Sequence, residues 1–271
     1  MSGGEAAVGQ LLDQAETSTR DSLAAAIQFD SPRFMKLGQK LSRQFREAQP
    51  FPHIAIDGLF PDAVLRQVVA ETPPIQSELW RVWGSGANVD LDQPSSLKRG
   101  ISEEGLMGPV TRGFLHSLNS ATFLGFLERL SGIAGLIPDP SFNGGGLHCT
   151  GRGARLLVHV DSDRHPLGNP FNQMVNLILF LNQDWDESYG GHLELWSRDA
   201  QQCVQRIAPL FNRLVIFRSG TTSYHGHPQP LACPPDRRRL SIATYYYVFN
   251  REKSEDYSGY RSQVQWAPQK Q

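Results

Sequence analysis

The sequence has few cysteines, no long apolar run and almost no net charge. Its 271 residues include only three cysteines, Cys149, Cys203 and Cys233, and no CxxC motif. An odd number of widely spaced cysteines argues against a disulfide framework and against a structural zinc site. We therefore expect a reducing environment, and we predict a cytoplasmic protein.

Segments that would direct the chain to a membrane are also lacking. No apolar stretch approaches the roughly 18 residues that a spanning helix needs, and the first residues do not resemble a signal peptide. Lys and Arg total 26 and Asp and Glu total 27, which gives a formal charge of −1. A near-neutral chain has no overall attraction to nucleic acid or to an anionic membrane. We expect neither as a partner.

Glycine and proline are abundant instead, with 25 and 18 residues, above their usual shares of roughly 7% and 5%. The hydrophobic fraction of 39% excludes a mostly disordered chain. This composition predicts many turns and short strands, not a helix bundle.

The first half of the chain shows helical patterns. Asp30-Ser31-Pro32 is a helix-start signal, and apolar residues then recur every three or four positions from Phe34 to Arg46. A strand is expected at 51–57, and further helices from Pro61, at 109–118 and at 120–130. Residues 72–108 have no clear period and contain Trp80 and Trp83, so this segment is either a lid or a structural loop.

From Gly144 onward, short apolar runs alternate with turn signals. This pattern predicts a β-sandwich or jelly roll. The expected strands are residues 154–160, 174–181, 192–196, 203–207, 213–217 and 240–249. The fold class is therefore α+β, with N-terminal helices supporting a double-stranded β-helix (jelly-roll) core. The predicted parts are a helical extension (1–48), one domain (49–250, core 144–249) and a polar tail (251–271).

A histidine and a carboxylate with strand spacing lie in the core. His159 and Asp161 are two residues apart, so in a strand they point to one face. His192 and Glu194 have the same spacing, which makes the pattern weak by itself. A further histidine follows at His225 or His227. Two histidines and one carboxylate on one side of a metal suit non-haem iron(II) that activates oxygen.

The remaining metal positions would be filled by co-substrates. A 2-oxo acid chelates a metal through its carboxylate and keto oxygen, and its far carboxylate then needs a cation. The planar fork of arginine matches a carboxylate. Arg239 opens the last strand, and the hydroxyl of Ser241 follows two residues later on the same face.

Five motifs in this order resemble the 2-oxoglutarate and iron(II)-dependent oxygenases, most closely the prolyl 4-hydroxylase-like branch. They are His159-x-Asp161, Gly190-Gly191-His192-Leu193-Glu194-Leu195-Trp196, residues 209–217, Tyr224-His225-Gly226-His227-Pro228 and Arg239-x-Ser241. The resemblance covers residues 144–249, with weaker similarity at 50–60. It implies a jelly-roll fold, the iron ligands His159, Asp161 and His225, and Arg239 with Ser241 as the anchor for 2-oxoglutarate. Iron(II), 2-oxoglutarate and O2 are the implied cofactors.

Some assignments stay open. His225 stands at the position before glycine that the branch uses, although His227 lies on the same strand face. The Arg-x-Ser spacing selects Arg239 over Arg238, and Arg237 and Arg238 are expected to be solvated. Leu156 stands where many prolyl hydroxylases have a tyrosine that contacts the co-substrate. Another polar residue must then complete that pocket; the candidates are Asn176, Gln173 and Asn182.

Three further groups are expected to have no role in the chemistry. His192 and Glu194 are predicted to form a surface pair. His148 is expected to be packed or exposed and not to line the substrate entrance. Tyr245, Tyr246 and Tyr247 are expected to pack in the core.

The resemblance implies an enzyme that hydroxylates an unactivated C–H bond and releases succinate and CO2. The presence of Asp161 favours hydroxylation over halogenation, because related halogenating enzymes lack that carboxylate; desaturation stays open. We predict a small-molecule substrate, such as an amino acid or derivative. The alternatives are a peptidyl-prolyl hydroxylase and a non-catalytic jelly-roll binding module.

Overall fold

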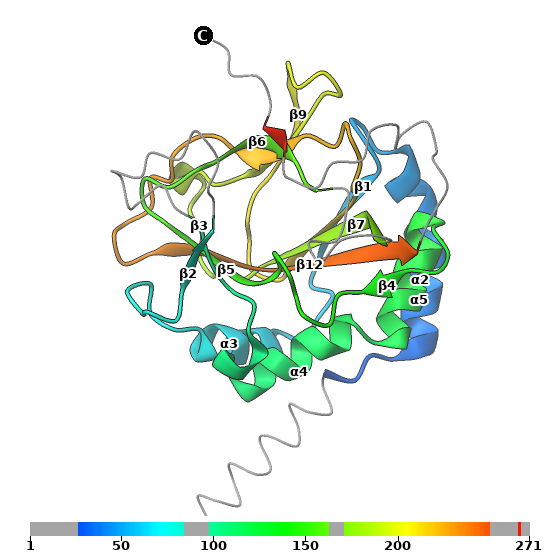
Figure 1. The fold of residues 1–271 in the computed structure, drawn as a ribbon, viewed down its shortest axis with the longest axis horizontal. Helices are drawn as coiled ribbons and strands as arrows, with labels where there is room; N and C mark the ends of the chain where they lie inside the picture. Colours follow the sequence, from blue (N-terminus) through cyan, green and yellow to red (C-terminus); the bar gives the residue numbers. More distant parts are fainter. Residues whose placement is uncertain (1–26, 84–97, 163–170, 250–264, 267–271) are drawn as a thin grey trace, which may run out of the picture.

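The structure is a computed structural model that describes residues 27–83, 98–162, 171–249 and 265–266 (Figure 1). Four α-helices lie in these ranges: α2 (Ser31–Glu47), α3 (Asp62–Glu71), α4 (Pro109–Leu118) and α5 (Ala121–Ser131). The strands are β1 (His53–Asp57), β2 (Arg81–Trp83), β3 (Lys98–Ile101), β4 (Ile137–Pro138), β5 (Gly146–Gly151), β6 (Leu156–Val160), β7 (Phe171–Phe180), β8 (Leu193–Trp196), β9 (Cys203–Ile207), β10 (Arg213–Arg218), β11 (His225–His227), β12 (Arg238–Phe249) and β13 (Gln265–Trp266). Every helix and strand that the sequence predicts is present, with ends shifted by a few residues.

The strands form two sheets. The large sheet has the order β1-β10-β7-β12-β5-β3-β2, with β4 paired to β12, and the small sheet has the order β13-β6-β11-β8-β9. All pairs of these strands are antiparallel. In Figure 1 the small sheet covers one face of the large sheet and the helices cover the other. Two stacked antiparallel sheets with a helical layer confirm the predicted α+β jelly roll.

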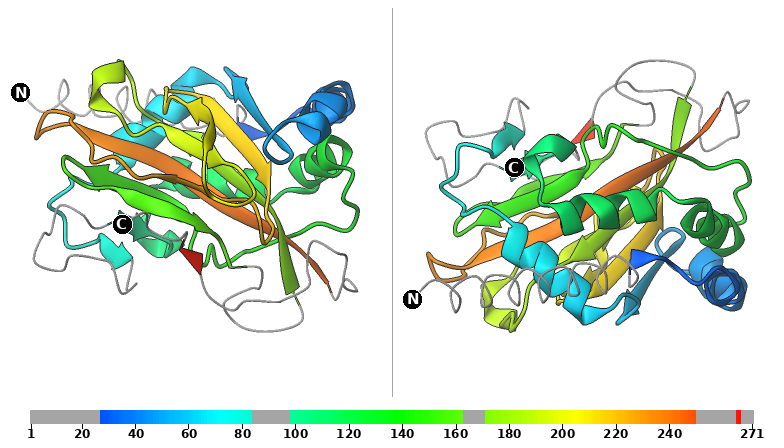
Figure 2. Two further views of the ribbon diagram at one scale, coloured as in Figure 1. Left: turned by 90° about the horizontal axis from the view of Figure 1, so that it is seen from above. Right: turned by 90° about the horizontal axis from the view of Figure 1, so that it is seen from below.

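Local signals explain where the supporting helices begin and end. The carboxylate of Asp30 accepts a hydrogen bond from the backbone N–H of Arg33 (2.8 Å), which caps α2. Ser120 caps α5 in the same way, and α5 ends at Gly132, whose positive φ of 76° suits glycine. Phe34 of α2 packs edge-on against Phe126 of α5. Figure 2 shows α2 and α5 side by side at one end of the molecule.

The long strand β12 separates an apolar face from a polar one. Leu240, Ile242 and Tyr246 belong to the apolar cluster that includes the helices, and the hydroxyl of Tyr246 donates to the carbonyl of Leu118 on α4 (3.0 Å). The alternate residues Arg239 and Ser241 face a cavity between the sheets. Strand periodicity thus places the predicted anchor residues inside the jelly roll.

The segment 72–108 is partly β-structure. Its strands β2 and β3 extend the large sheet beyond β5. Trp80 is buried, and its indole N–H donates to the carbonyl of Pro74 (2.8 Å), so this residue fixes the loop in place. The side chain of Trp83 and residues 84–97 lie outside the described residues. β2 and β3 have only three and four residues, which is too few to show a hydrophobic period, so the sequence pattern of this segment does not predict them.

Most of the predicted tail, 251–271, also lies outside the described residues. Its one described part, β13, pairs with β6 beside His159 and Val160. Within the described ranges, no helix combines the length and apolarity needed to cross a bilayer. The domain boundaries at residues 48 and 250 remain predictions.

Candidate active site

The structure brings His159, Asp161 and His225 together. His159 on β6 pairs directly with His225 on β11 in the small sheet, and Asp161 follows β6 immediately. One possible ligand atom from each of the three lies within 4.8 Å of the others. Nε2 of His159 is 3.5 Å from Oδ1 of Asp161, and Nε2 of His225 is 3.6 Å from Oδ2. Two imidazole nitrogens and one carboxylate, facing one point, fit an iron(II) ion.

Backbone carbonyls orient both imidazoles. Nδ1 of His159 donates to the carbonyl of Leu157 (2.7 Å), and Nδ1 of His225 donates to the carbonyl of Ser223 (3.0 Å). A carbonyl oxygen only accepts, so each Nδ1 carries a proton, and Nε2 is the ring nitrogen on the side of Asp161 that can bind a metal. Burial lowers the pKa of His225 to about 4. His225 is therefore already neutral, the form that binds a metal.

Asp161 is held as a carboxylate. Burial alone would raise its pKa, but His225, His159 and Lys98 together keep the pKa well below the usual range. The side-chain amide of Asn176 on β7 donates to Oδ2 of Asp161. Asn176 thus orients the carboxylate, a contact that sequence reasoning missed when it proposed Asn176 for the co-substrate. Its own Oδ1 has no hydrogen-bond partner among the described residues, so a ligand contact remains a prediction.

Arg239 is buried at another part of the same cavity, with only 6% of its surface exposed. Its Nε donates to the carbonyl of Gly191 (2.7 Å), and its guanidinium carbon lies 4.7 Å from the ring centre of Phe180. Burial lowers the pKa of Arg239 to about 10, so it is still a cation at neutral pH. In the described part of the chain, the two Nη groups have no protein partner and are free to bind an anion. Ser241 lines the cavity beside it.

The glycine pair in the second motif has a structural reason. A Cβ on Gly191 would lie 2.5 Å from a methyl carbon of Leu231 and 3.0 Å from Cδ of Arg239, and the φ of Gly191 is +72°. Only glycine leaves room for the arginine at this point. Gly191 therefore both admits the Arg239 side chain and accepts its hydrogen bond.

The cavity has a volume of about 50 Å³ and includes residues that the sequence did not assign to the site, among them Lys98 and Thr150. His148 is buried, but it lines this cavity, and so does Tyr245, which was expected to pack in the core. Burial lowers the pKa of Lys98 to about 8, against the opposing effect of Asp161. Lys98 belongs to β3, whose pairing with β5 joins distant parts of the chain. No local signal in the sequence could have found it.

Other polar candidates have structural roles. Asn182 hydrogen-bonds the carbonyls of Pro209 and Leu240 and the N–H of Leu240, and Gln173 donates to the hydroxyl of Ser219. Arg238 points away from the cavity, as predicted, but it is not simply solvated. It donates to the carbonyl of Pro73, and Arg237 donates to that of Gln183.

His192 and Glu194 are buried, with 8% and 7% exposed, so the predicted surface pair is wrong. Glu194 accepts from the indole of Trp196 (3.1 Å) and pairs with Arg206 (3.4 Å). Neither residue belongs to a metal-binding group within the described residues. Arg206 lies directly opposite Glu194 in the β8–β9 pair, a contact across two strands that the alternation along one strand does not predict.

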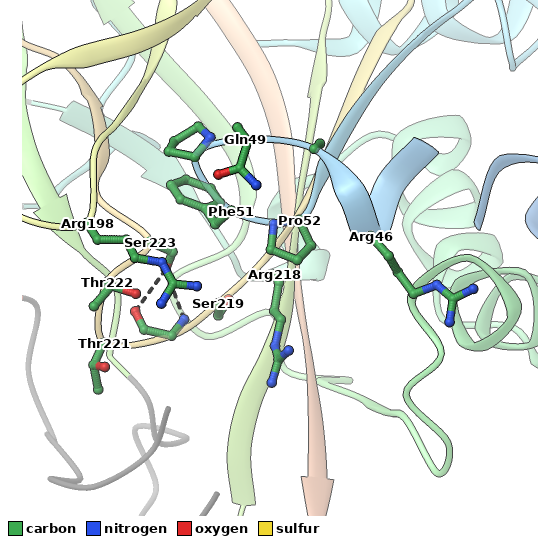
Figure 3. Close-up of a pocket in the computed structure, with 13 residues that line it drawn as sticks. Arg46, Gln49, Phe51, Pro52, Arg198, Arg218, Ser219, Thr221, Thr222 and Ser223 are labelled. Atoms are coloured by element: carbon green, nitrogen blue, oxygen red, sulfur yellow. Dashed lines mark hydrogen bonds between the residues drawn. The ribbon is translucent and has the colours of Figure 1, made fainter. Parts of the chain in front are cut away.

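A second pocket of about 170 Å³ opens beside the loop Ser219–Ser223, which leads into His225. Three arginines line it: Arg46 at the end of α2, Arg198 between β8 and β9, and Arg218 at the end of β10. Figure 3 shows Arg198 against the loop, Arg218 next to it and Arg46 on the far side. The described lining contains no acidic residue, so the pocket favours an anionic group.

Comparison with known proteins agrees with this site. The family model of the 2OG-Fe(II) oxygenase superfamily matches residues 145–247, which include all three metal-site residues and Arg239. Prolyl 3-hydroxylase OGFOD1 of Mus musculus is 27% identical over 139 residues, which are 49% of this chain and 23% of that protein. The match thus spans about a quarter of the length of that relative.

Solved structures of prolyl hydroxylases share the fold. A prolyl hydroxylase of Trichoplax adhaerens, in complex with a hypoxia inducible factor peptide, superposes with a TM-score of 0.54 and 20% identity over 81% of this chain and 91% of that chain. SnoK, a non-heme alpha ketoglutarate dependent carbocyclase from nogalamycin biosynthesis, superposes with a TM-score of 0.50. It is 14% identical, and the superposition covers 78% of this chain and 83% of that chain.

Residues 145–247 thus match the family model of the 2OG-Fe(II) oxygenase superfamily, in agreement with the resemblance in the sequence.

Proposed function

We propose that the protein is a 2-oxoglutarate and iron(II)-dependent oxygenase that hydroxylates an unactivated C–H bond. Substrate C–H, O2 and 2-oxoglutarate would give the alcohol, succinate and CO2. The observation that carries this proposal is the convergence of His159, Asp161 and His225 within 4.8 Å. The carboxylate of Asp161 fills one metal position, which favours hydroxylation over halogenation.

In this proposal His159, Asp161 and His225 hold the iron(II), which supplies the oxygen chemistry when it is bound. Arg239 binds the far carboxylate of 2-oxoglutarate through its Nη groups, because Nε is committed to Gly191. Ser241 adds a hydroxyl. The narrow, buried cavity excludes water and strengthens these charged contacts.

The test is anaerobic addition of iron(II) and 2-oxoglutarate, which should produce a visible charge-transfer band, followed by succinate formation under oxygen. His159→Ala should abolish both signals. His116→Ala is the matched control, because His116 is an exposed histidine that pairs with Glu104 at the surface. Wild-type protein with neither band nor succinate would contradict the proposal.

For the substrate, we propose a small molecule, such as an amino acid or a derivative. The described cavity around the metal site is small, about 50 Å³, and Leu156, Ile178 and Leu193 are part of its lining. Such a space suits one small group. A screen of amino acids and N-acyl amino acids should release succinate together with a product heavier by one oxygen atom.

A peptidyl-prolyl hydroxylase is the second candidate. The relatives above include a prolyl 3-hydroxylase and a prolyl hydroxylase bound to a peptide, and the arginine-lined pocket suits an acidic stretch of a peptide. In this case proline peptides with acidic flanks should be turned over, and Arg46→Ala combined with Arg198→Ala should raise their KM. If only N-acetylproline is turned over, and the double variant turns it over as well as the wild type does, the result would favour a small-molecule substrate.

A further inference from the structure

Strand β11 carries a second buried histidine, His227. It is 5% exposed and lines the same cavity as Arg239 and Ser241. Between the two histidines, β11 approaches β6 closely: a Cβ on Gly226 would lie 2.8 Å from the carbonyl oxygen of Leu156. The glycine therefore lets the strand carry both imidazoles into one cavity.

The hydrogen bonds of His227 differ from those of the two metal-site histidines. His159 and His225 each donate from Nδ1 to a backbone carbonyl. Nδ1 of His227 is buried and has no hydrogen-bond partner among the described residues. Buried polar atoms are nearly always paired, so an unpaired one in a cavity points to a ligand. Without a carbonyl to orient its ring, His227 is also the poorer candidate for the metal.

The surroundings indicate which ligand group His227 meets. An imidazole ring has two nitrogens, and at least one of them carries an N–H that can donate a hydrogen bond. Arg239 offers its Nη donors in the same cavity, and the hydroxyls of Thr150 and Ser241 lie there too. A carboxylate accepts several hydrogen bonds and pairs with a cation, so it fits this end of the cavity.

We propose that His227 is a further binding residue for 2-oxoglutarate, donating a hydrogen bond to the far carboxylate beside Arg239. This inference rests on the proposed role of Arg239 as the anchor. A carboxylate has about four lone-pair sites, so it can accept from the guanidinium and the imidazole together. The imidazole N–H adds a directional contact, and so it raises the affinity for a ligand that has a hydrogen-bond acceptor at this end of the cavity.

The test compares two ligands. The dissociation constants of 2-oxoglutarate and of 2-oxopentanoate, which has a methyl group in place of the far carboxylate, are measured on the iron(II)-loaded protein without oxygen. In His227→Leu the dissociation constant for 2-oxoglutarate should rise about tenfold or more, as expected for a lost hydrogen bond to a charged group. The dissociation constant of the same variant for 2-oxopentanoate should stay unchanged. His227→Gln restores an N–H donor and should recover part of the affinity.

The control is His192→Leu, another buried histidine with an unpaired Nδ1 that lies outside the lining of this cavity. It should leave both constants unchanged. Equal weakening of both ligands in His227→Leu would overturn the inference, as would loss of iron binding, which would make His227 a metal ligand. If the leucine variant does not fold, His227→Val provides the same comparison.

Different results would contradict the proposed function and the proposed role of His227. Wild-type protein that binds no 2-oxoglutarate would overturn the proposed function. Wild-type binding that His227→Leu leaves unchanged would overturn the role of His227 alone.

Discussion

The two faces of the large sheet hold different kinds of side chain. Towards the helices, β7 and β12 present Leu177, Leu179 and Ile242, which are fully buried in one apolar cluster. Towards the small sheet, the same strands present Asn176, Arg239 and Ser241, which are just as buried but polar. The outer face provides stability by removing apolar surface from water. The inner face keeps polar groups in fixed positions for ligands.

This difference predicts that substitutions on the two faces should separate binding from folding. Inner-face changes should alter iron or 2-oxoglutarate binding more than they alter the free energy of unfolding. Outer-face changes should lower the free energy of unfolding and leave iron and 2-oxoglutarate binding unchanged. The four predictions below test this separation, beginning with the largest effect.

Asp161→Ala should lower succinate formation by at least about 10³-fold, the upper end of the cost of losing one catalytic electrostatic contact. The variant should also lose some stability, because Lys98 loses an opposite charge and Asn176 loses its acceptor, so succinate formation is compared per folded molecule. Succinate assays and urea titrations measure the two effects. A variant that unfolds but keeps its activity per folded molecule would contradict the assignment.

Leu179→Ala should destabilise the protein by about 2–5 kcal/mol, because the side chain is fully buried between Leu214 and Ile242 on the helix-facing side. The iron and 2-oxoglutarate dissociation constants of the remaining folded protein should be unchanged. Urea unfolding gives the first quantity, and anaerobic titration gives the second. A large loss of ligand affinity at constant stability would show that the two faces are not independent.

Arg239→Met should raise the dissociation constant of 2-oxoglutarate by about 100-fold, because a buried charge pair between protein and ligand is lost. Iron affinity should stay the same. Arg239→Lys should show a smaller loss, since it keeps the charge but not the fork. The matched control is Arg238→Met on the opposite face, where the side chain donates to Pro73; this variant should bind 2-oxoglutarate normally.

Asn176→Ala should weaken iron binding by about tenfold, since partners that orient a metal ligand usually contribute 10–100-fold. Its amide donates to Asp161 and fixes the carboxylate. Gln173→Ala, on the same strand but bonded to Ser219, is the control with unchanged iron affinity. An Asn176 variant with normal iron binding and weakened 2-oxoglutarate binding would instead support the role that the sequence predicts for it.

Much of the fold follows from local signals. Capping at Asp30 and Ser120 and the spacing of apolar residues set the helix ends, because these interactions join residues three or four apart. Residues two apart on a strand point to the same face, so the alternation along β12 puts Arg239 and Ser241 on one side of the sheet. Local patterns could not predict β2, β3 and β13, which are short strands defined by their pairing partners.

The sequence by itself determined the spacing of His159 and Asp161, the Arg239-Ser241 pair and the family that these motifs indicate. Only the tertiary structure decided which side chains share the cavity. It added Lys98 and His148 and buried His192 and Glu194. It also paired Nδ1 of His225 with a carbonyl and left Nδ1 of His227 without a partner among the described residues. The physical reason is that spacing along a strand is a local property of the backbone. Burial and hydrogen bonding depend on strand pairs that join residues far apart in the chain.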